Sequence, residues 1–299
     1  MNRRNIPAVE MHQYGQEHLR QEGIVILPVM ESMADDPQRL HPHYHDFFQV
    51  SLIIGRGRLM HDFREREIDG PTLFFLRPGQ VHTIGAREGL SGTVISFTQA
   101  FFDHESPPPS RLYEMPFFSP GETVPWLSLD EGQAGPMAEI FMALQGEFDG
   151  ALEGAAEVLR ALLCILFVKA GRLYAAAHPV GRASRGSLLA RQFSLEVERR
   201  FREWHSLPSY ARQLGVSANH LNDVVREQTG HAAGEIIRAR RLLDAKRLLL
   251  HSDLSVSEIG YQLGFEDPSY FSRFFRRCTL HTPARFRQEI REKYQSGRH

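Results

Sequence analysis

Two segments in the last third of this 299-residue chain carry polar side chains suited to hydrogen bonding and anion binding. Each segment also has apolar residues at helical spacing, which should leave the polar ones facing solvent. Asn, His, Ser and Arg at the exposed start of a helix can reach base edges, and arginines further along can neutralise phosphates. The outward residues are Ser217, Asn219, His220, Asn222, Asp223 and Arg226 in the first segment and Ser269, Tyr270, Ser272, Arg273, Arg276 and Arg277 in the second.

The sequence before each segment is repeated. Residues 208–217 (PSYARQLGVS) are echoed by residues 256–265 (VSEIGYQLGF), and a small residue lies four positions before a glycine in both copies. Two helices crossing at a tight turn need this pair, because the small residue permits close approach and glycine accepts the left-handed conformation that ends the first helix. The repeat predicts two helix-turn-helix units. A single helix with outward polar residues could equally be an ordinary solvated helix, whereas two such helices in tandem favour contact with nucleic acid.

A second helix is expected after each turn. Ser217 is a suitable N-cap for the first, and Asp267 followed by Pro268 for the second. The residues expected to face the core are Leu221, Val224 and Val225 in the first helix and Phe271, Phe274 and Phe275 in the second.

Residues 232 to about 251 read as one helix between the two units. Its apolar residues include Ile237 and Leu249, and its polar ones are Arg238, Arg240, Arg241, Lys246 and Arg247. About 20 residues at 1.5 Å each span roughly 30 Å, close to the ~34 Å between successive major-groove segments on one face of B-DNA. Such a spacer would let both recognition helices enter the groove on the same side of the duplex.

Residues 190–292 resemble the arabinose-regulator (AraC/XylS-type) family of bacterial transcription factors. The resemblance rests on Leu214–Ser217, Thr229-Gly230, Ile259-Gly260, Gly264-Phe265, Ser269–Arg277 and Thr282-Pro283. Two residues depart from the family pattern: Leu280 replaces the usual glycine after the second recognition helix, and Ala233 replaces a common proline at the start of the linker helix. A left-handed Leu costs on the order of 1 kcal/mol, so that helix could end differently here.

The first half changes to short β-rich runs separated by turns. The runs are Ile24 to Val29, Phe47 to Ile54, Gly57 to Phe63, Pro71 to Leu76 and Gly92 to Phe97. Their spacing predicts a small antiparallel barrel. His43–Gln49 (HYHDFFQ) and Pro78–His82 (PGQVH) are similar to the two motifs of a cupin barrel, the kind that arabinose-type regulators commonly use as sensing domains.

The cupin resemblance makes His43, His45, Gln49 and His82 candidates for the barrel interior. In metal-binding cupins the matching positions hold a divalent ion, but Gln49 stands where Glu is usual, which removes a negative ligand. Three readings remain open: a metal site, an effector pocket without metal, and polar residues satisfied by hydrogen bonds at strand ends. The pocket is favoured, because a barrel mouth suits one small ligand.

An aromatic acid is the expected effector. Residues 41–49 and 74–82 look most like the branch of the family related to regulators of hydroxybenzoate catabolism. Phe47, Phe74 and Phe97 could provide an apolar wall, while a histidine or one of Arg56, Arg58 and Arg77 could meet the carboxylate. The candidate effector-binding residues are His43, His45, Gln49, Arg77 and His82.

Two amphipathic stripes follow the barrel, around residues 137–148 and 158–167, and predict an antiparallel helical hairpin. In the resembled family this element pairs two subunits, which implies a homodimer through residues 136–173; packing on the chain's own barrel is the alternative. Residues 175–187 lack periodicity and are rich in small and basic residues. The expected organisation is therefore a sensing and dimerisation domain (1–174), a linker (175–187) and a DNA-binding domain (188–299).

Charge follows the same division. Residues 1–150 carry 11 Lys and Arg against 21 Asp and Glu, and residues 151–299 carry 24 against 15, so the halves differ as −10 and +9. A basic second half suits a polyanion. No signal peptide or membrane span is expected, which favours the cytoplasm. Cys164 and Cys278 lie within apolar helical patterns and are expected to be buried thiols.

These features together predict a non-enzymatic, ligand-responsive regulator that activates a catabolic operon. It would bind promoter DNA sequence-specifically and contact RNA polymerase. No cofactor is assigned with certainty, and a bound divalent metal is disfavoured. A cupin-type metalloenzyme fused to a DNA-binding domain is the main alternative. A nucleoid-type protein without sequence preference is a third, opposed by the outward polar residues such as Asn219 and Arg273.

Overall fold

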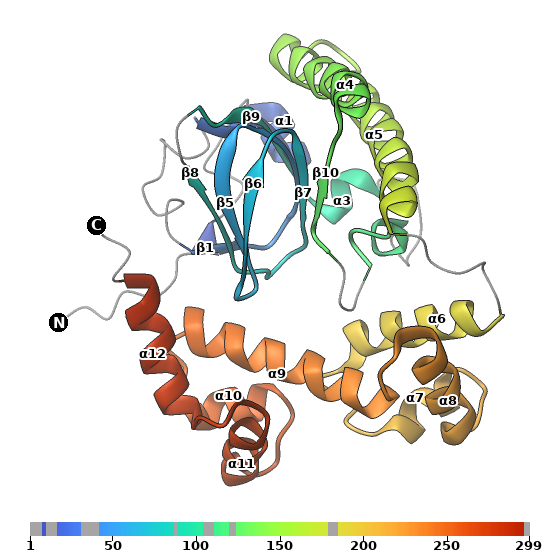
Figure 1. Cartoon of the computed structure of the whole chain (residues 1–299), viewed down its shortest axis with the longest axis vertical. Coiled ribbons are helices and arrows are strands. Elements are labelled where there is room, and N and C mark those ends of the chain that lie inside the picture. The colour runs from blue at the N-terminus through green and yellow to red at the C-terminus, as the bar shows by residue number, and fades with distance from the viewer. Residues whose placement is uncertain are drawn as a thin grey trace. The chain divides into compact units, whose positions relative to one another are not determined.

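The computed structural model describes residues 8–9, 17–30, 42–86, 89–103, 111–119, 124–178 and 185–295. They form two compact units (Figure 1). The described residues up to 178 make up the barrel unit, and residues 185–295 make up the helical unit. The expected linker, residues 175–187, lies in part outside the described residues, as does the proline-rich segment 106–110. Residues 175–177 of the expected linker belong to the end of α5, and residues 185–187 belong to the start of α6.

The barrel unit contains two antiparallel sheets and a short parallel pair. The first sheet has the order β10-β7-β4-β9-β2, and the second the order β6-β5-β8. The strands of the first are β2 (Ile24–Pro28), β4 (Phe48–Ile54), β7 (Thr72–Leu76), β9 (Ser91–Phe97) and β10 (Trp126–Ser128). Those of the second are β5 (Arg56–His61), β6 (Arg64–Asp69) and β8 (His82–Ala86), and β1 (Ala8–Val9) pairs with β3 (Tyr44–His45).

All five predicted strands are present, and the cupin-like β-rich fold is confirmed. The sequence reading missed β6 and β8, as well as the short strands β1, β3 and β10. In β6 five of six residues are exposed and most are charged, so its strand pattern is hidden. Charge on an edge strand of this kind discourages pairing with other chains. Arg58 on β5 lies 2.8 Å from Glu67 on β6, and Arg56 lies 3.1 Å from Asp69.

Alternation along the strands divides the unit into two apolar clusters. One face of the first sheet packs against helices, where Phe97 meets Phe167 with 5.7 Å between ring centroids. The opposite face meets the second sheet around Ile53, Leu59 and Phe74, which are fully buried. Phe97 therefore belongs to the helix-facing core, and its expected place in the effector wall is wrong, because its strand position puts it on the other face from Phe74.

Two long helices form the predicted hairpin, α4 (Glu131–Gly150) and α5 (Ala155–Ala177). Asp130 begins α4 with a capping box to Gln133, and Ala151 ends it in the left-handed conformation. Shorter helices complete the unit: α1 (Glu17–Glu22), α3 (Gln99–Phe102) and a 3-10 turn (Arg111–Glu114). The hairpin buries one stripe on the barrel and leaves hydrophobic side chains exposed elsewhere, notably Met142, Val158, Ile165 and Val168.

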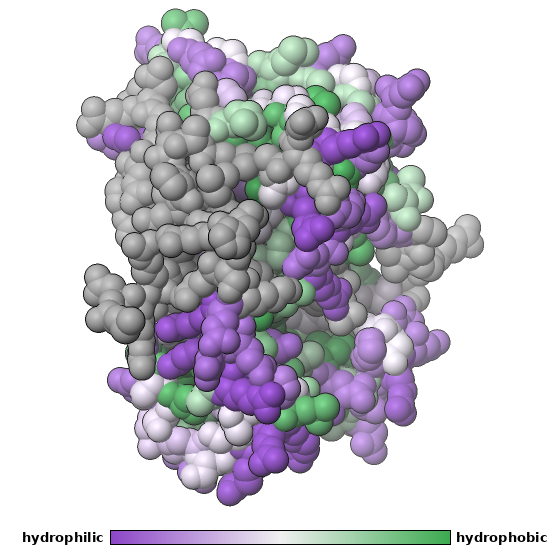
Figure 2. All heavy atoms as spheres, turned by 60° about the vertical axis from the view of Figure 1, so that its left-hand side comes forward, coloured by the Kyte–Doolittle hydropathy of each residue, from purple (hydrophilic) through white to green (hydrophobic). Residues whose placement is uncertain are grey.

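The helical unit has one continuous apolar core that runs through both helix-turn-helix units. Its helices are α6 (Arg185–Arg200), α7 (Leu207–Gln213), α8 (Ala218–Thr229), α9 (Ala233–His251), α10 (Val256–Gln262), α11 (Pro268–Thr279) and α12 (Pro283–Gln295). The long helix α9 runs between the pair α7–α8 and the pair α10–α11 (Figure 1), as predicted. Hydrophilic side chains make up much of the described surface of this unit in the view of Figure 2.

Two further expectations can be compared with the fold. Cys164 and Cys278 are both exposed, so the prediction of buried thiols is wrong: each lies on the solvent side of its helix. None of the helices in the described residues combines the length and apolar character needed to cross a bilayer.

Candidate DNA-binding surface and histidine cluster

The first helix-turn-helix unit is built as its sequence predicts. Gly215 has a φ of 67° at the turn, and the small residue Ala211 is buried. The hydroxyl of Ser217 accepts a hydrogen bond from the backbone N–H of His220 and begins α8. Leu221 and Val225 face the core and are fully buried. The N-terminal residues of α8 are therefore held at the surface.

The second unit repeats this design with a tighter crossing. Gly264 has a φ of 73°, and Asp267 caps α11 by accepting from the backbone N–H of Ser269. A Cβ on Gly260 would lie only 3.3 Å from Phe271, which shows why the smallest residue stands where α10 crosses α11. Phe271 is buried in the core with Phe274 and Phe275, as predicted.

Most of the predicted DNA-contacting side chains lie at the surface. The exposed ones are Ser217, Asn219, His220, Asp223 and Arg226 on the first unit and Ser269, Tyr270, Arg273, Arg276 and Arg277 on the second. Asn222 and Ser272, which occupy matching positions, are half-buried. Asn222 accepts a hydrogen bond from the backbone N–H of Ala233 at 3.2 Å. A proline at position 233 would lack that N–H. Ala233, which stands where proline is common in the family, therefore allows a hydrogen bond that ties α9 to α8.

Arg273 is oriented by its own helix. Its guanidinium lies 3.7 Å from the carboxylate of Asp267 and 5.9 Å from the ring of Tyr270. Both partners stand at the start of α11, and the Arg273 and Asp267 side chains remain largely exposed. The ion pair is weak in water, and the two contacts together place the guanidinium near the exposed start of α11.

The two recognition helices end in the same way. Thr229 and Thr279 each donate a hydroxyl hydrogen bond to the carbonyl four residues earlier, and each accepts one from the N–H two residues later. Gly230 follows with a φ of 77°, and Leu280 follows with a φ of 65°. The expectation that the helix could end differently at Leu280 is therefore wrong, because a leucine takes the left-handed conformation there.

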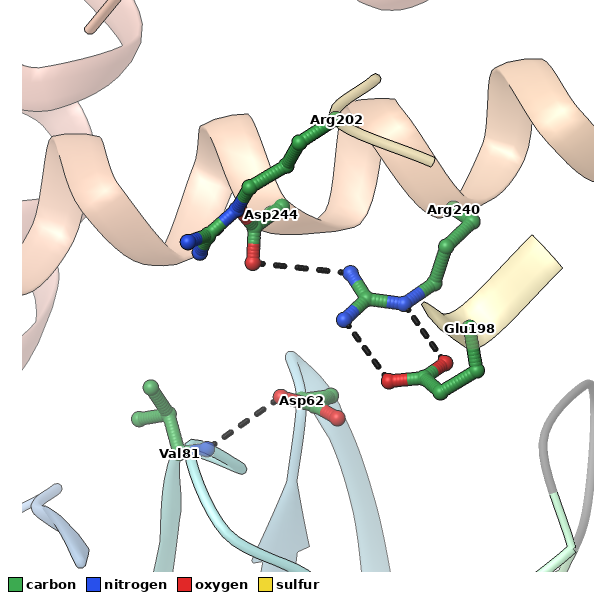
Figure 3. A network of polar contacts seen from close by, with 6 residues as sticks. All are labelled: Asp62, Val81, Glu198, Arg202, Arg240 and Asp244. Carbon is green, nitrogen blue, oxygen red and sulfur yellow. Dashed lines mark hydrogen bonds and ion pairs between the residues drawn. The ribbon is translucent and has the colours of Figure 1, made fainter. Parts of the chain in front are cut away.

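The polar face of α9 holds the helical unit together, which the sequence reading missed. Arg240 makes two hydrogen bonds to the carboxylate of Glu198 on α6, at 2.7 and 2.9 Å, and one to Asp244 at 3.5 Å (Figure 3). Asp244 also accepts two from Arg202, at 2.8 and 3.1 Å. Burial alone would lower the pKa of Arg240, but the two carboxylates raise it above its ordinary value. The sequence reading missed these contacts because arginines spaced along a helix usually indicate a solvent-exposed face.

Arg241 is buried on another side of α9. Its guanidinium donates to the backbone carbonyl of Leu263 at 3.0 Å and lies 4.0 Å from the ring centroid of Phe265. Burial lowers its pKa to about 10, so it remains a cation at neutral pH. Arg241 therefore ties α9 to the turn of the second unit.

In the barrel unit, three of the predicted effector residues come together. The rings of His43 and His82 have centroids 4.3 Å apart, and His45 and His82 lie 4.8 Å apart. His61, which the sequence reading missed, pairs with His82 across β5 and β8. His61 stands two residues after the inward-facing Leu59 on β5, so alternation along that predicted strand could have found it.

Two of these imidazoles have a defined tautomer. Nδ1 of His82 donates to the carbonyl of Gln80 at 3.0 Å, and Nδ1 of His45 donates to the carbonyl of Phe47 at 2.8 Å, since a carbonyl can only accept. Burial, together with His43 and His45, lowers the pKa of His82 well below its ordinary value. His82 is thus neutral at pH 7, and its Nε2 is a hydrogen-bond acceptor. It suits a hydroxyl or amide donor better than a carboxylate.

Within the described residues, no three His, Cys, Asp or Glu side chains are grouped so as to hold a metal ion. Gln49 is buried and its amide donates to the hydroxyl of Ser51 at 3.3 Å, so it occupies the interior as a neutral group. The interior offers hydrogen-bonding groups among apolar walls, which is the composition of a site for a small organic molecule.

Of the three arginines weighed for the effector's carboxylate, only Arg77 is buried. Arg56 and Arg58 are exposed and pair with acidic residues of β6, which leaves Arg77 as the candidate among the three. Arg77 follows β7, and its backbone N–H donates to the Gln80 side chain at 2.6 Å. Phe47 stacks on His45 with 4.0 Å between centroids, and Phe74 lies 6.5 Å from His82. Both aromatic rings remain beside the histidines.

Comparisons with known proteins agree with both units. Residues 31–162 match the model of an AraC-like ligand binding domain, and residues 210–289 match that of a helix-turn-helix domain. The chain therefore belongs to the AraC family of ligand-responsive, DNA-binding transcription regulators.

Several relatives match across both units. The chain is 28% identical to the HTH-type transcriptional activator RhaR of Salmonella schwarzengrund over 257 residues, covering 82% of this chain and 86% of that one. It is 26% identical to the activator RhaS of Citrobacter koseri over 258 residues, covering 84% and 89%. Among solved structures, ToxT from Vibrio cholerae is 15% identical, covers 84% of this chain and 92% of its own, and has a TM-score of 0.43.

Proposed function

We propose that the chain activates transcription by binding a promoter through α8 and α11 when a small molecule occupies its barrel. The observation that carries this proposal is the repeated pair of recognition helices, each capped, packed on one core and presenting polar residues at its exposed start. Relatives named as transcriptional activators support the positive sign. A chain with this function works in the cytoplasm and contacts RNA polymerase.

Sequence-specific binding is tested with the full chain. Its affinity for its own upstream promoter fragment should exceed that for a scrambled fragment at physiological salt. Arg273→Ala should weaken promoter binding by about 1–3 kcal/mol and relax the preference at one base pair, because Arg273 stands where a base edge can be read. Arg276→Ala is the matched change, expected to weaken binding to both fragments equally through a lost phosphate contact.

Equal affinity of the unaltered chain for both fragments would contradict sequence-specific recognition and favour a nucleoid-type protein. An unchanged promoter affinity for Arg273→Ala would instead contradict only the assignment of that side chain.

The effector is proposed to be an aromatic acid bearing a ring hydroxyl, as in the hydroxybenzoate-related branch, and the regulated genes a catabolic operon. Neutral His82 would accept the hydroxyl hydrogen, Phe47 and Phe74 would contact the ring, and Arg77 would pair with the carboxylate. His43, His45 and Gln49 would complete the site. The sensing domain is proposed to cover residues 1–174, the linker 175–187 and the DNA-binding domain 188–299.

A panel of aromatic acids with and without a ring hydroxyl tests this assignment. The hydroxylated acids should shift promoter affinity, and His82→Ala or His45→Ala should remove the shift while leaving effector-free DNA binding unchanged. A response to polyols and not to aromatic acids would contradict the ligand class. Stoichiometric metal in the purified chain together with turnover of an acid would revive the cupin-enzyme alternative.

Dimerisation is proposed through the exposed apolar side of the hairpin, residues 136–173. Val158, Ile165 and Val168 are each more than 40% exposed on α5, which is unusual for a helix that packs only on its own barrel. Ile165→Glu should convert a dimer to a monomer in sedimentation, whereas Arg172→Glu on the same helix should not. In the dimer, effector binding would shift the population toward the arrangement that engages the promoter.

A further inference from the structure

A polar junction joins the two helix-turn-helix units in addition to the apolar core. On one side, Arg202, which follows α6, bonds to Asp244 of α9, and Asp244 bonds to Arg240. Arg240 is in turn held by Glu198 of α6 through two hydrogen bonds (Figure 3). The side chains of Arg240 and Asp244 are only 14% and 8% exposed, so water screens these charges weakly.

The same loop also abuts the turn of the second unit. A Cβ on Gly264 would lie 2.2 Å from the carbonyl oxygen of Arg202 and 2.6 Å from Nε2 of His205. His205 donates to that same carbonyl at 2.9 Å and stacks on Phe265. Arg241 closes the junction from α9 through Leu263 and Phe265. The loop after α6 therefore contacts both α9 and the second turn.

Charged groups in such a network are geometrically demanding. Apolar side chains tolerate small shifts of one helix against another, whereas paired guanidinium and carboxylate groups have defined directions and are costly to leave unpaired when buried. The planar guanidinium of Arg241, held by a carbonyl and an aromatic face, has the same property. A junction of this kind favours a fixed distance and angle between the two turns.

We propose that this junction, formed by Glu198, Arg202, Arg240, Arg241 and Asp244, sets the distance and angle between the two recognition helices and thereby the spacing of the two DNA segments that the unit accepts. The inference rests on the proposed DNA-binding function. These are positioning residues, because each acts through α9 or a turn and none lies on the outward face of α8 or α11.

The spacing is tested with promoter fragments that carry one inserted or one deleted base pair between the two contacted segments. One base pair shifts the second segment by about 3.4 Å and about 35° around the helix axis, so a rigid unit loses the contacts of one recognition helix. The unaltered chain should bind the shifted fragments about 10-fold to 100-fold more weakly. Arg241→Met replaces the guanidinium with an unbranched apolar side chain. The ratio of the affinity for the natural spacing to that for the shifted spacing should then fall to about threefold or less.

Arg238→Met is the matched control, an exposed arginine of the same helix outside the junction, and should leave the ratio unchanged. Arg202→Met provides a milder variant in case Arg241→Met fails to fold, because the Arg202 side chain is 48% exposed. A folded variant with an unchanged ratio would refute the positioning role while leaving DNA binding established.

A measurement without DNA separates this inference from the proposed function. Gln228 and Cys278 are exposed and occupy matching positions near the ends of α8 and α11. In a Cys164→Ser, Gln228→Cys chain, spin labels on both thiols should give one narrow distance distribution, which Arg241→Met or Arg202→Met should broaden. Equally narrow distributions in the folded variants would overturn the proposal, whether or not the chain prefers its promoter.

Discussion

Replacing Leu280 by glycine should stabilise the helical unit. Leu280 ends α11 with a φ of 65°, a conformation that costs an L-residue with a side chain roughly 1–2 kcal/mol. The residue is 84% exposed, so its removal sacrifices little buried apolar surface. Glycine has greater freedom in the unfolded chain, which offsets roughly 0.5–1 kcal/mol of the gain. The expected net increase in the free energy of unfolding is about 0.5–1 kcal/mol.

The chain provides a convenient assay for this change. Its two tryptophans are Trp126 in the barrel unit and Trp204 in the helical unit. In a Trp126→Phe background, fluorescence during urea unfolding reports on the helical unit alone. The midpoint for Leu280→Gly should rise with an unchanged slope, since the slope follows the surface exposed on unfolding.

Two controls isolate the backbone effect. Leu280→Ala removes the side chain but retains a Cβ, so it should leave stability nearly unchanged. Gly230→Leu places the same strain at the matching position of the first unit and should lower stability by about 1 kcal/mol or more. If Leu280→Gly left the midpoint where it was or lowered it, or if Leu280→Ala raised it equally, the argument from backbone strain would be refuted.

Two other changes test the packing and the electrostatics of the units. Gly264→Ala should destabilise the helical unit by more than 2 kcal/mol in the same assay, because the added Cβ meets the carbonyl of Arg202 as well as an unfavourable φ; Gly215→Ala has open space and should cost only about 1 kcal/mol. The barrel unit should lose stability as pH falls below about 6.5, because the unfolded chain then protonates His82 while the folded pKa is depressed by burial and by His43 and His45. His82→Gln should flatten that decline, measured by Trp126 fluorescence in a Trp204→Phe background; an equally steep pH dependence would assign the linked proton elsewhere.

The helical unit shows how much local sequence can determine. The turn glycines, the caps at Ser217 and Asp267 and the apolar faces of α8 and α11 follow rules that act within one or two helical turns. They predicted both recognition helices and the linker helix between them. The outward faces followed directly, since a helix that buries one stripe exposes the other. Whether those faces contact DNA at the named residues stays a prediction.

The strands and the inward-facing residues of the barrel were harder to predict from the sequence. Alternating apolar strands such as β4 and β9 were found, but β6 has an exposed, charged sequence and β8 follows a proline-glycine turn. Without β8, His61 could not be placed opposite His82. Phe97 was assigned to the wrong face for a related reason, because alternation shows that two faces exist but not which one meets the helices.

The sequence by itself determined the apolar strands of the barrel, the two hairpin helices and the residue at which each recognition helix begins, because hydrogen bonds and side-chain sterics between near neighbours decide these features. Only the tertiary structure decided the roles of Arg240, Arg241 and Asp244, because each has a partner 22 or 42 residues away in the chain. A charged side chain at the surface and one in a buried junction have the same letter in a sequence. What separates them is the set of carboxylates, carbonyls and aromatic faces that folding brings within hydrogen-bonding distance.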